Sequence, residues 1–190
     1  MGHAGTLDPS ASGVLLILCG SATRRTEEFM DLPKEYRARI RFGFSTTTDD
    51  FEGEVIESHP VEAWDSQRVD DEVLALKQLT EQIPPAVSAI KVGGKRAYKV
   101  ARSGAEVQLA PHQISVYEAE LIVQRPPEIE VFIRCSRGTY IRSIARDLGA
   151  RLGWGGTLAS LVRTAIGPYR VEHALSLHEI FKRSSEFFGQ

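Results

Sequence analysis

Hydrophobic and polar residues alternate strictly between residues 34 and 44, and this is the clearest pattern in the chain. A period of two places the apolar residues on one side of an extended backbone. The pattern therefore predicts a half-buried strand. Its apolar side consists of Tyr36, Ala38, Ile40, Phe42 and Phe44, and most of the intervening positions are charged.

Strands are also expected at 113–124 and 128–136, where the connection Arg125-Pro126-Pro127 favours an antiparallel pair. Shorter strands are expected at 14–19 and 54–58. Residues 66–82 have apolar positions at helical spacing and predict an amphipathic helix. Further helices are predicted at 24–32 with Thr23 as N-cap, from Thr139 as N-cap to about residue 152, and at 175–181, ahead of a frayed tail from 182 to 190.

The chain of 190 residues is long enough for one hydrophobic core and a small appendage. No apolar run approaches the roughly 20 residues needed to span a bilayer, and no secretory leader is recognisable. Cys19 and Cys135 lie in apolar segments and suit buried free thiols in a reducing compartment. We therefore expect a cytoplasmic protein, and no metal site, because the histidines and cysteines show no ligand spacing.

Charge is segregated along the chain, although the net charge is only −2. Residues 49–72 are acidic with a single base, Arg68, whereas 86–104 and 134–151 are basic. The basic segments could line one face against a phosphate backbone, or they could be solvated helix faces, and charge alone favours neither reading. The first basic segment contains Lys91, Lys95, Arg96, Lys99 and Arg102.

The stretch Gly2-His3-Ala4-Gly5-Thr6-Leu7-Asp8-Pro9-Ser10-Ala11-Ser12-Gly13-Val14 presents a single carboxylate, Asp8, in an otherwise small, apolar or hydroxylated segment. Glycines allow tight turns, and Pro9 pushes Asp8 away from helical geometry. The segment predicts a stiff loop that displays one acid. An Asp-Pro pair on its own is most often an ordinary turn.

The whole stretch is similar to the signature of the TruB family of pseudouridine synthases, approximately G-H-T-G-T-L-D-P-x-A-T-G-V-L, in which the aspartate is catalytic. Ala4 and Ser12 stand where the family usually has threonine. The resemblance implies that Asp8 is catalytic, either by covalent attack on the sugar or base or by deprotonating C2′. It also implies that His3 contacts RNA beside the target base.

Further motifs resemble the family in the same order. Lys34-Glu35-Tyr36 matches a strand whose tyrosine stacks on the target uracil, although a core aromatic with a wet hydroxyl is the plainer reading of Tyr36. Residues 134–149 match almost completely and place Tyr140 and Arg142 at a strand-to-helix junction. There the resemblance implies that Arg142 pairs with the aspartate, and we expect Tyr140 to help remove the C5 proton. The plainer reading is that both side chains only cover the helix end.

Residues 83–104 resemble the family segment that forms a thumb-like insertion over the RNA stem-loop. A short strand, a Gly-Gly turn and a basic helix are expected there, with Lys95, Lys99 and Arg102 on one helical face. Leu161-Val162-Arg163-Thr164 resembles the family's L-R-R-T segment, in which Leu161 would form an apolar wall against the flipped base. Val162 replaces a common arginine.

The resemblance implies an α+β pseudouridine synthase fold, with a central, mostly antiparallel mixed sheet flanked by helices. Residues 1–177 would form the catalytic domain, with 83–112 as the RNA-binding insertion and 178–190 as a C-terminal tail. The implied activity is isomerisation of uridine 55 in the T-loop of tRNA to pseudouridine, through base flipping and glycosidic bond cleavage. No metal or organic cofactor is implied, the partner is the T-arm of tRNA, and we expect a monomer.

Two alternatives stand beside this interpretation. The chain could be a non-catalytic, tRNA-binding or folding-assisting remnant, although a remnant would not need Asp8, Tyr36, Tyr140 and Arg142 together. The second alternative is an unrelated small-molecule enzyme, but the chain lacks a cofactor or phosphate-loop motif. The strand and helix that usually precede the family's G-H-x-G loop, and its C-terminal RNA-binding domain, are not recognisable here. We therefore expect lower stability or weaker RNA binding than in a full-length relative.

Overall fold

A computed structural model describes residues 1–88, 91–92, 95–96 and 109–188, with side chains for 1–88 and 109–182. Its centre is a six-stranded sheet in which β4 (Lys34–Phe42) lies between β12 (Glu128–Cys135) and β13 (Gly156–Ile166). β11 (Val116–Arg125) extends the sheet beyond β12, and the short strands β14 (Tyr169–Arg170) and β2 (Ser12–Gly13) pair with β13. All pairs are antiparallel except β2 with β13. The mixed, mostly antiparallel α+β architecture confirms the expected fold class.

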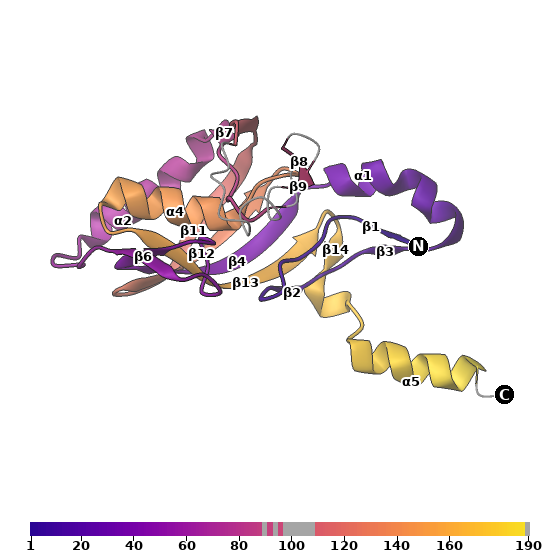
Figure 1. Cartoon of the computed structure of the whole chain (residues 1–190). Coiled ribbons are helices and arrows are strands. Elements are labelled where there is room, and N and C mark those ends of the chain that lie inside the picture. The colour runs from indigo at the N-terminus through magenta and orange to yellow at the C-terminus, as the bar shows by residue number, and fades with distance from the viewer. Residues whose placement is uncertain (89–90, 93–94, 97–108, 189–190) are drawn as a thin grey trace.

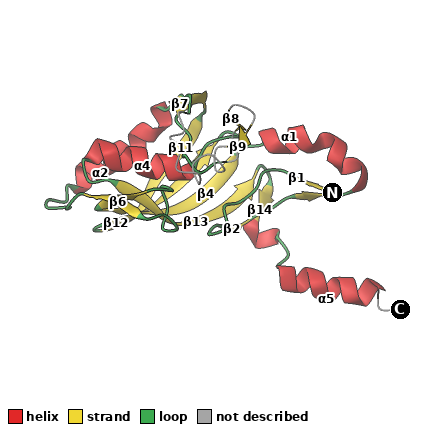
Figure 2. Ribbon diagram, viewed as in Figure 1, coloured by secondary structure: helices red, strands yellow, loops and turns green. Residues whose placement is uncertain are grey.

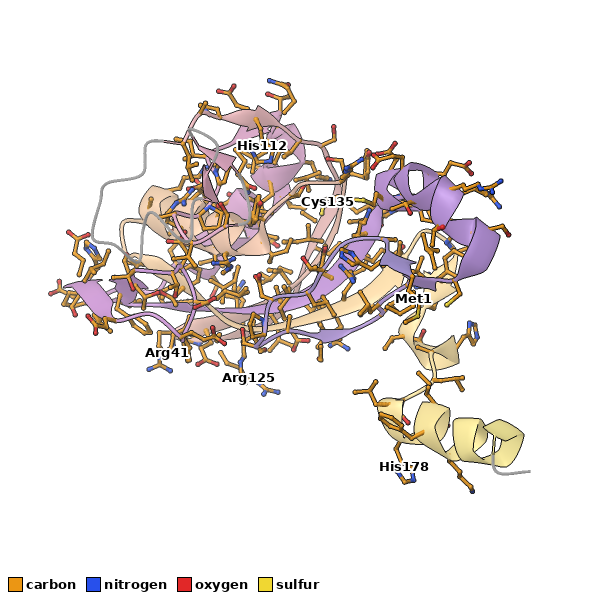
Figure 3. All side chains as sticks on the ribbon, turned by 45° about the vertical axis from the view of Figure 1, so that its right-hand side comes forward. Met1, Arg41, His112, Arg125, Cys135 and His178 are labelled. Atoms are coloured by element: carbon orange, nitrogen blue, oxygen red, sulfur yellow. The ribbon has the colours of Figure 1, made fainter. Side chains whose placement is uncertain are left out.

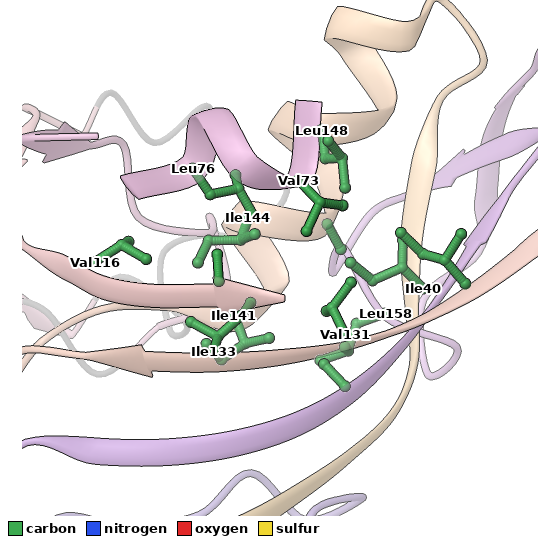
Figure 4. Packing of buried hydrophobic residues seen from close by; sticks show 14 of the residues in the cluster. Ile40, Val73, Leu76, Val116, Val131, Ile133, Ile141, Ile144, Leu148 and Leu158 are labelled. Atoms are coloured by element: carbon green, nitrogen blue, oxygen red, sulfur yellow. The ribbon is translucent and has the colours of Figure 1, made fainter. Parts of the chain in front are cut away.

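Two helices cover one face of this sheet, as Figures 1 and 2 show. They are α2 (Ser66–Ala75), which continues as the 3₁₀ turn η2 (Leu76–Gln78), and α4 (Ile141–Leu152). Their apolar sides pack on the inward residues of β4, β11, β12 and β13 (Figure 4). Removing this apolar surface from water is the main stabilising contribution to such a layered fold. Fully buried members include Ile40, Val73, Leu76, Val131, Ile133, Ile144 and Leu148.

The opposite face of the sheet is polar, as the alternation in 34–42 predicts. Arg37 pairs with Glu130 at 2.7 Å and Arg41 with Glu128 at 3.0 Å across neighbouring strands. Figure 3 shows Arg41 and Arg125 projecting from the side away from the helices. The predicted strands at 113–124 and 128–136 are present as β11 and β12 with the expected antiparallel pairing.

The N-terminal region differs in detail from the sequence-based expectation. The strand predicted at 14–19 is reduced to β3 (Ile17–Leu18), which pairs with β1 (Gly2–His3). The helix predicted from residue 24 begins as a 3₁₀ turn, η1 (Gly20–Arg25), before α1 (Thr26–Asp31). Thr23 is not an N-cap, because it lies inside η1 and its hydroxyl donates to the Gly20 carbonyl at 2.8 Å.

Helix boundaries elsewhere were also predicted imperfectly. The helix expected over 66–82 ends at Gln78, and the chain then forms β7 (Glu81–Gln82), paired with β10 (His112–Gln113). Tyr140 rather than Thr139 is the N-cap residue of α4. The tail expected to fray from residue 182 is helical as far as Phe188, in α5 (Leu177–Phe188), which follows the turn η3 (Val171–His173); residues 189 and 190 lie outside the described residues.

The short strands β5 (Phe44–Thr46) and β6 (Val55–Ser58) form a separate hairpin, close to the predicted strand at 54–58. In the basic insertion, β8 (Lys91–Val92) pairs with β9 (Lys95–Arg96). Lys95 and Arg96 are therefore extended and do not begin the expected helix. Lys99 and Arg102 lie outside the described residues. Among the described helices, none combines the length and apolar character needed to cross a bilayer.

Candidate active site

The loop that carries Asp8 is anchored at both ends. Its entrance pairs with β3, and its exit, β2, runs parallel to β13. Gly13 has a φ of 109°, and a Cβ at this position would collide with the main chain of Arg163. The loop lies so close to β13 that only glycine fits there. The Ala11 N–H also donates to the Asp8 carbonyl at 2.9 Å, which closes a turn directly behind the acid.

Arg163 in β13 binds this loop from beneath. Its side chain donates to the carbonyl oxygens of Val14 at 2.7 Å, Gly5 at 3.1 Å and Thr6 at 3.2 Å. The residue is only 2% exposed, and among the described residues no carboxylate lies within ion-pair distance of it. A buried charge is costly unless it is well hydrogen-bonded, and here the carbonyls on both sides of Asp8 provide those bonds. No role was predicted for Arg163 from sequence, where it appeared only within the Leu161-Val162-Arg163-Thr164 motif.

We expect Arg163→Met to lower the free energy of unfolding by about 2–4 kcal/mol, because it leaves buried carbonyl groups without donors. Urea denaturation followed by circular dichroism measures the change. Arg39→Met is the matched control: Arg39 lies on the exposed side of β4, its side chain is 54% exposed, and we expect an effect of about 0.5 kcal/mol or less. Equal effects of the two substitutions would contradict the structural role of Arg163.

Asp8 forms an ion pair with Arg142 of α4. The Arg142 Nε lies 2.9 Å from Asp8 Oδ2, and Nη2 lies 3.3 Å from Oδ1. The same guanidinium donates to the carbonyls of Thr48 at 3.0 Å and Val87 at 3.1 Å. The side chain of Arg142 is 7% exposed and that of Asp8 is 39% exposed. The acid therefore remains accessible while a buried guanidinium, fixed by two carbonyls, holds its orientation through two charge-assisted hydrogen bonds.

Asp50 stands behind this pair, with Oδ2 3.7 Å from the Arg142 Nε. Its other carboxylate oxygen accepts from the Thr48 hydroxyl and from the Glu52 N–H. Its neighbour Asp49 is bonded to Arg146 at 3.0 Å, and burial raises the pKa of the Asp49 carboxyl while Arg146 opposes that shift. Asp50 was not predicted as a site residue, because adjacent acids point different ways and no further ligands follow them in the sequence; the structure buries it to 6% exposure. Among the described residues no group of acids, histidines and cysteines is arranged to hold a metal.

A cavity of about 300 Å³ opens beside Asp8. Its walls come from the Asp8 loop, β4, β13 and the start of α4. Burial raises the pKa of Tyr36 to about 12 and also raises that of Tyr140; Arg142 opposes the second shift and the charge of Asp8 reinforces it. Both phenols are therefore neutral near pH 7. The predicted residues that line the cavity are His3, Asp8, Tyr36, Tyr140 and Leu161.

Arg142 lies behind Asp8, in the wall of a second hollow that Asp8 and Tyr140 share. Lys34, which also lines the main cavity, was recognised from sequence only as part of a motif. Its ammonium donates to the carbonyls of Met30 and Leu32 at the end of α1. Burial, followed by the charge of Arg163, lowers the pKa of Lys34 to about 8. For the expected RNA-binding residues Lys91, Lys95 and Arg96, only the main chain is described.

Solved structures share this fold. The chain superposes on a protein of a Cbf5–Nop10–Gar1 complex with a TM-score of 0.74 and 24% sequence identity, over 98% of this chain and 46% of that one. It also superposes on a protein of an H/ACA ribonucleoprotein bound to a substrate RNA, with a TM-score of 0.67 and 22% identity, over 100% of this chain and 46% of that one. The class defined here is the α+β fold that these structures share, with Asp8 and Arg142 paired beside a cavity.

Sequence comparison defines the family within this class. Residues 1–141 match the TruB family pseudouridylate synthase N-terminal domain, and the chain belongs to this family. Similar proteins include tRNA pseudouridine synthase B of Thermobifida fusca, 47% identical over 188 residues, and that of Phocaeicola vulgatus, 44% identical over 177 residues. These alignments cover 95% and 93% of this chain. The chain spans 64% of the length of the first relative and 75% of the second.

Proposed function

We propose that this chain forms the catalytic part of a tRNA pseudouridine synthase that acts on the T-loop uridine at position 55. The observation that carries the proposal is the accessible Asp8 carboxylate, paired with buried Arg142 at the edge of a cavity lined by Tyr36 and Leu161. Relatives named tRNA pseudouridine synthase B, at 41–47% identity, support the same substrate.

The reaction needs no external reactant. The C1′–N1 glycosidic bond breaks, the uracil rotates, and a C1′–C5 bond forms; the proton on C5 then leaves and N1 gains one. Asp8 supplies the ionised carboxylate, by attack on the sugar or base or by removing the C2′ proton. A stacked base cannot reach this carboxylate, so the uridine is flipped into the cavity.

The surrounding side chains suit a neutral, flat ligand. Tyr36 provides an un-ionised aromatic ring for stacking, and Leu161 provides an apolar wall. Tyr140 lies beside Asp8 and is the group we assign to help remove the C5 proton. His3 stands at the exposed rim, where it contacts RNA next to the flipped nucleotide.

The partner in this proposal is the T-arm of tRNA, bound through phosphates by the insertion at 83–112 and its basic residues, with residues 1–177 as the catalytic domain. Residues 178–190 follow that domain. The protein acts as a monomer in the cytoplasm and uses no cofactor.

Tritium release from unmodified tRNA, transcribed with uridine labelled at C5, tests the proposal. We expect near-stoichiometric release, with pseudouridine found at the T-loop position by nucleoside analysis. A transcript carrying cytidine at this position should release no tritium. Tight tRNA binding without release would instead favour the non-catalytic remnant, and release that survives the cytidine substitution would identify a different target uridine.

A further inference from the structure

The stem of the basic insertion is bound to the start of α4. We call residues 81–87 and 112–113 the root, because β7 and β10 pair there and enclose the insertion between them. The Ile114 N–H donates to the Thr80 carbonyl at 3.0 Å and extends this pairing by one step. The root therefore has a defined geometry of its own, next to the helix that carries Tyr140 and Arg142.

Gln82 makes the most specific contact in the root. Its side-chain Nε2 donates to the Tyr140 carbonyl at 3.0 Å, and its Oε1 accepts from the Tyr140 N–H at 2.8 Å. Gln82 is 3% exposed. Tyr140 is the N-cap residue of α4, so its N–H has no partner within the helix. One buried amide thus holds both main-chain polar groups of Tyr140.

The other root residues reinforce this position. The His112 ring lies edge-on to the Tyr140 ring, with 6.0 Å between centroids, and the His112 Nε2 lies 2.9 Å from the Gly138 carbonyl oxygen. The Ile83 carbonyl accepts from the Ser143 hydroxyl at 2.9 Å, and the Val87 carbonyl accepts from Arg142. The root therefore contacts both Tyr140 and Arg142, the two residues beside Asp8.

We infer that Gln82 is a positioning residue for the reaction and fixes Tyr140 against the base beside Asp8. The inference rests on the proposed function. A phenol that contacts a reacting atom must be held closely, and a displacement of about 1 Å costs roughly 10²-fold in rate. Gln82 lines neither of the two hollows that Tyr140 shares with Asp8, so it acts through the main chain of Tyr140. Through Gln82 the base of the insertion sets catalytic geometry, separately from the basic residues further along the insertion.

Gln82→Leu tests this inference, because leucine keeps the apolar bulk and removes both hydrogen bonds. We expect the single-turnover rate of tritium release to fall by about 10- to 100-fold, with tRNA Kd changed less than about threefold. Gln82→Glu retains an acceptor for the Tyr140 N–H but buries a carboxylate oxygen against the Tyr140 carbonyl oxygen, so it should not restore the wild-type rate. Gln113→Leu, on the exposed side of the partner strand, is the matched control and should behave as the wild type.

A second readout does not depend on turnover. In protein containing 3-fluorotyrosine, the Tyr140 resonance, assigned with Tyr140→Phe, should shift or broaden in Gln82→Leu and stay unchanged in Gln113→Leu. An unmoved resonance together with an unchanged rate in active protein would overturn the role of Gln82. A loss confined to tRNA affinity would also overturn it. A wild type that releases no tritium would overturn the proposed function itself, which is a distinct result.

Discussion

Asp8→Asn should reduce tritium release from tRNA by at least about 10⁴-fold, which is the scale seen when a reacting group is removed from an active site. Asparagine has nearly the same shape but cannot act as an anionic nucleophile or base. Because Asp8 is partly exposed and its loop is held by Arg163 through main-chain carbonyls, the substitution leaves the fold intact. The expected pattern is full tRNA binding with no turnover.

The control for this experiment is Asp71→Asn, in an exposed position on α2, which removes a carboxylate far from the cavity. It should retain wild-type rate and affinity. Thermal unfolding of both variants checks that neither has lost structure. Turnover by Asp8→Asn above about one per cent of wild type would show that Asp8 is not the reacting group.

Arg142→Met is expected to have the second largest effect, about 10²- to 10³-fold on the single-turnover rate. Methionine fills much of the space but leaves Asp8 without its cation and the carbonyls of Thr48 and Val87 without a donor. Without Arg142 the Asp8 carboxylate loses both hydrogen bonds that orient it beside the cavity. The loss should therefore appear in the chemical step and be larger than the loss of tRNA affinity.

Arg142→Lys separates charge from geometry. Lysine keeps the positive charge but cannot make the paired contact to Asp8 while also reaching two carbonyls, so only part of the rate should return. Arg151→Met, at the far end of the same helix, is the control and should leave the rate unchanged. If Arg142→Met retained the full rate, the pairing with Asp8 would have no part in the chemistry.

The parts of the fold that sequence reasoning predicted well are those with a strong period. The alternation in β4 and β12 follows from burial of one face, and the helical spacing in α4 follows from packing on that face. The weak point was the N-terminal segment 14–19, which is apolar throughout and has no alternation to fix its state. Its conformation is set by pairing with β1 and by a hydrogen bond from the Val14 N–H to the Arg163 carbonyl in β13. The hydrophobic pattern within the segment does not identify these partners, which lie outside it.

The residues of the candidate site likewise fall into those that the sequence predicted and those that it did not. Asp8, Tyr36, Tyr140 and Leu161 were found through motifs, and the structure brings them to one cavity; their catalytic and binding roles remain predictions. Arg163 and Gln82 were not found, because each acts on main-chain groups. A main-chain carbonyl leaves no trace in the sequence, so Gln82 carried no signal and Arg163 was noted only as a member of the Leu161-Val162-Arg163-Thr164 motif.

The contacts of Arg163 also bear on the order of folding. Its carbonyl partners lie 149 to 158 positions away along the chain. Contacts of such separation close very long loops, and they form late because the entropy of closure must be offset by other structure first. Synthesis runs from the N-terminus to the C-terminus, so the Asp8 loop is synthesised before β13 and cannot pack on it until β13 has been made. A nascent chain that does not yet include residue 163 therefore contains Asp8 but lacks the arginine whose hydrogen bonds order the Asp8 loop. The active site can form only after β13, the last long strand of the sheet, has been synthesised.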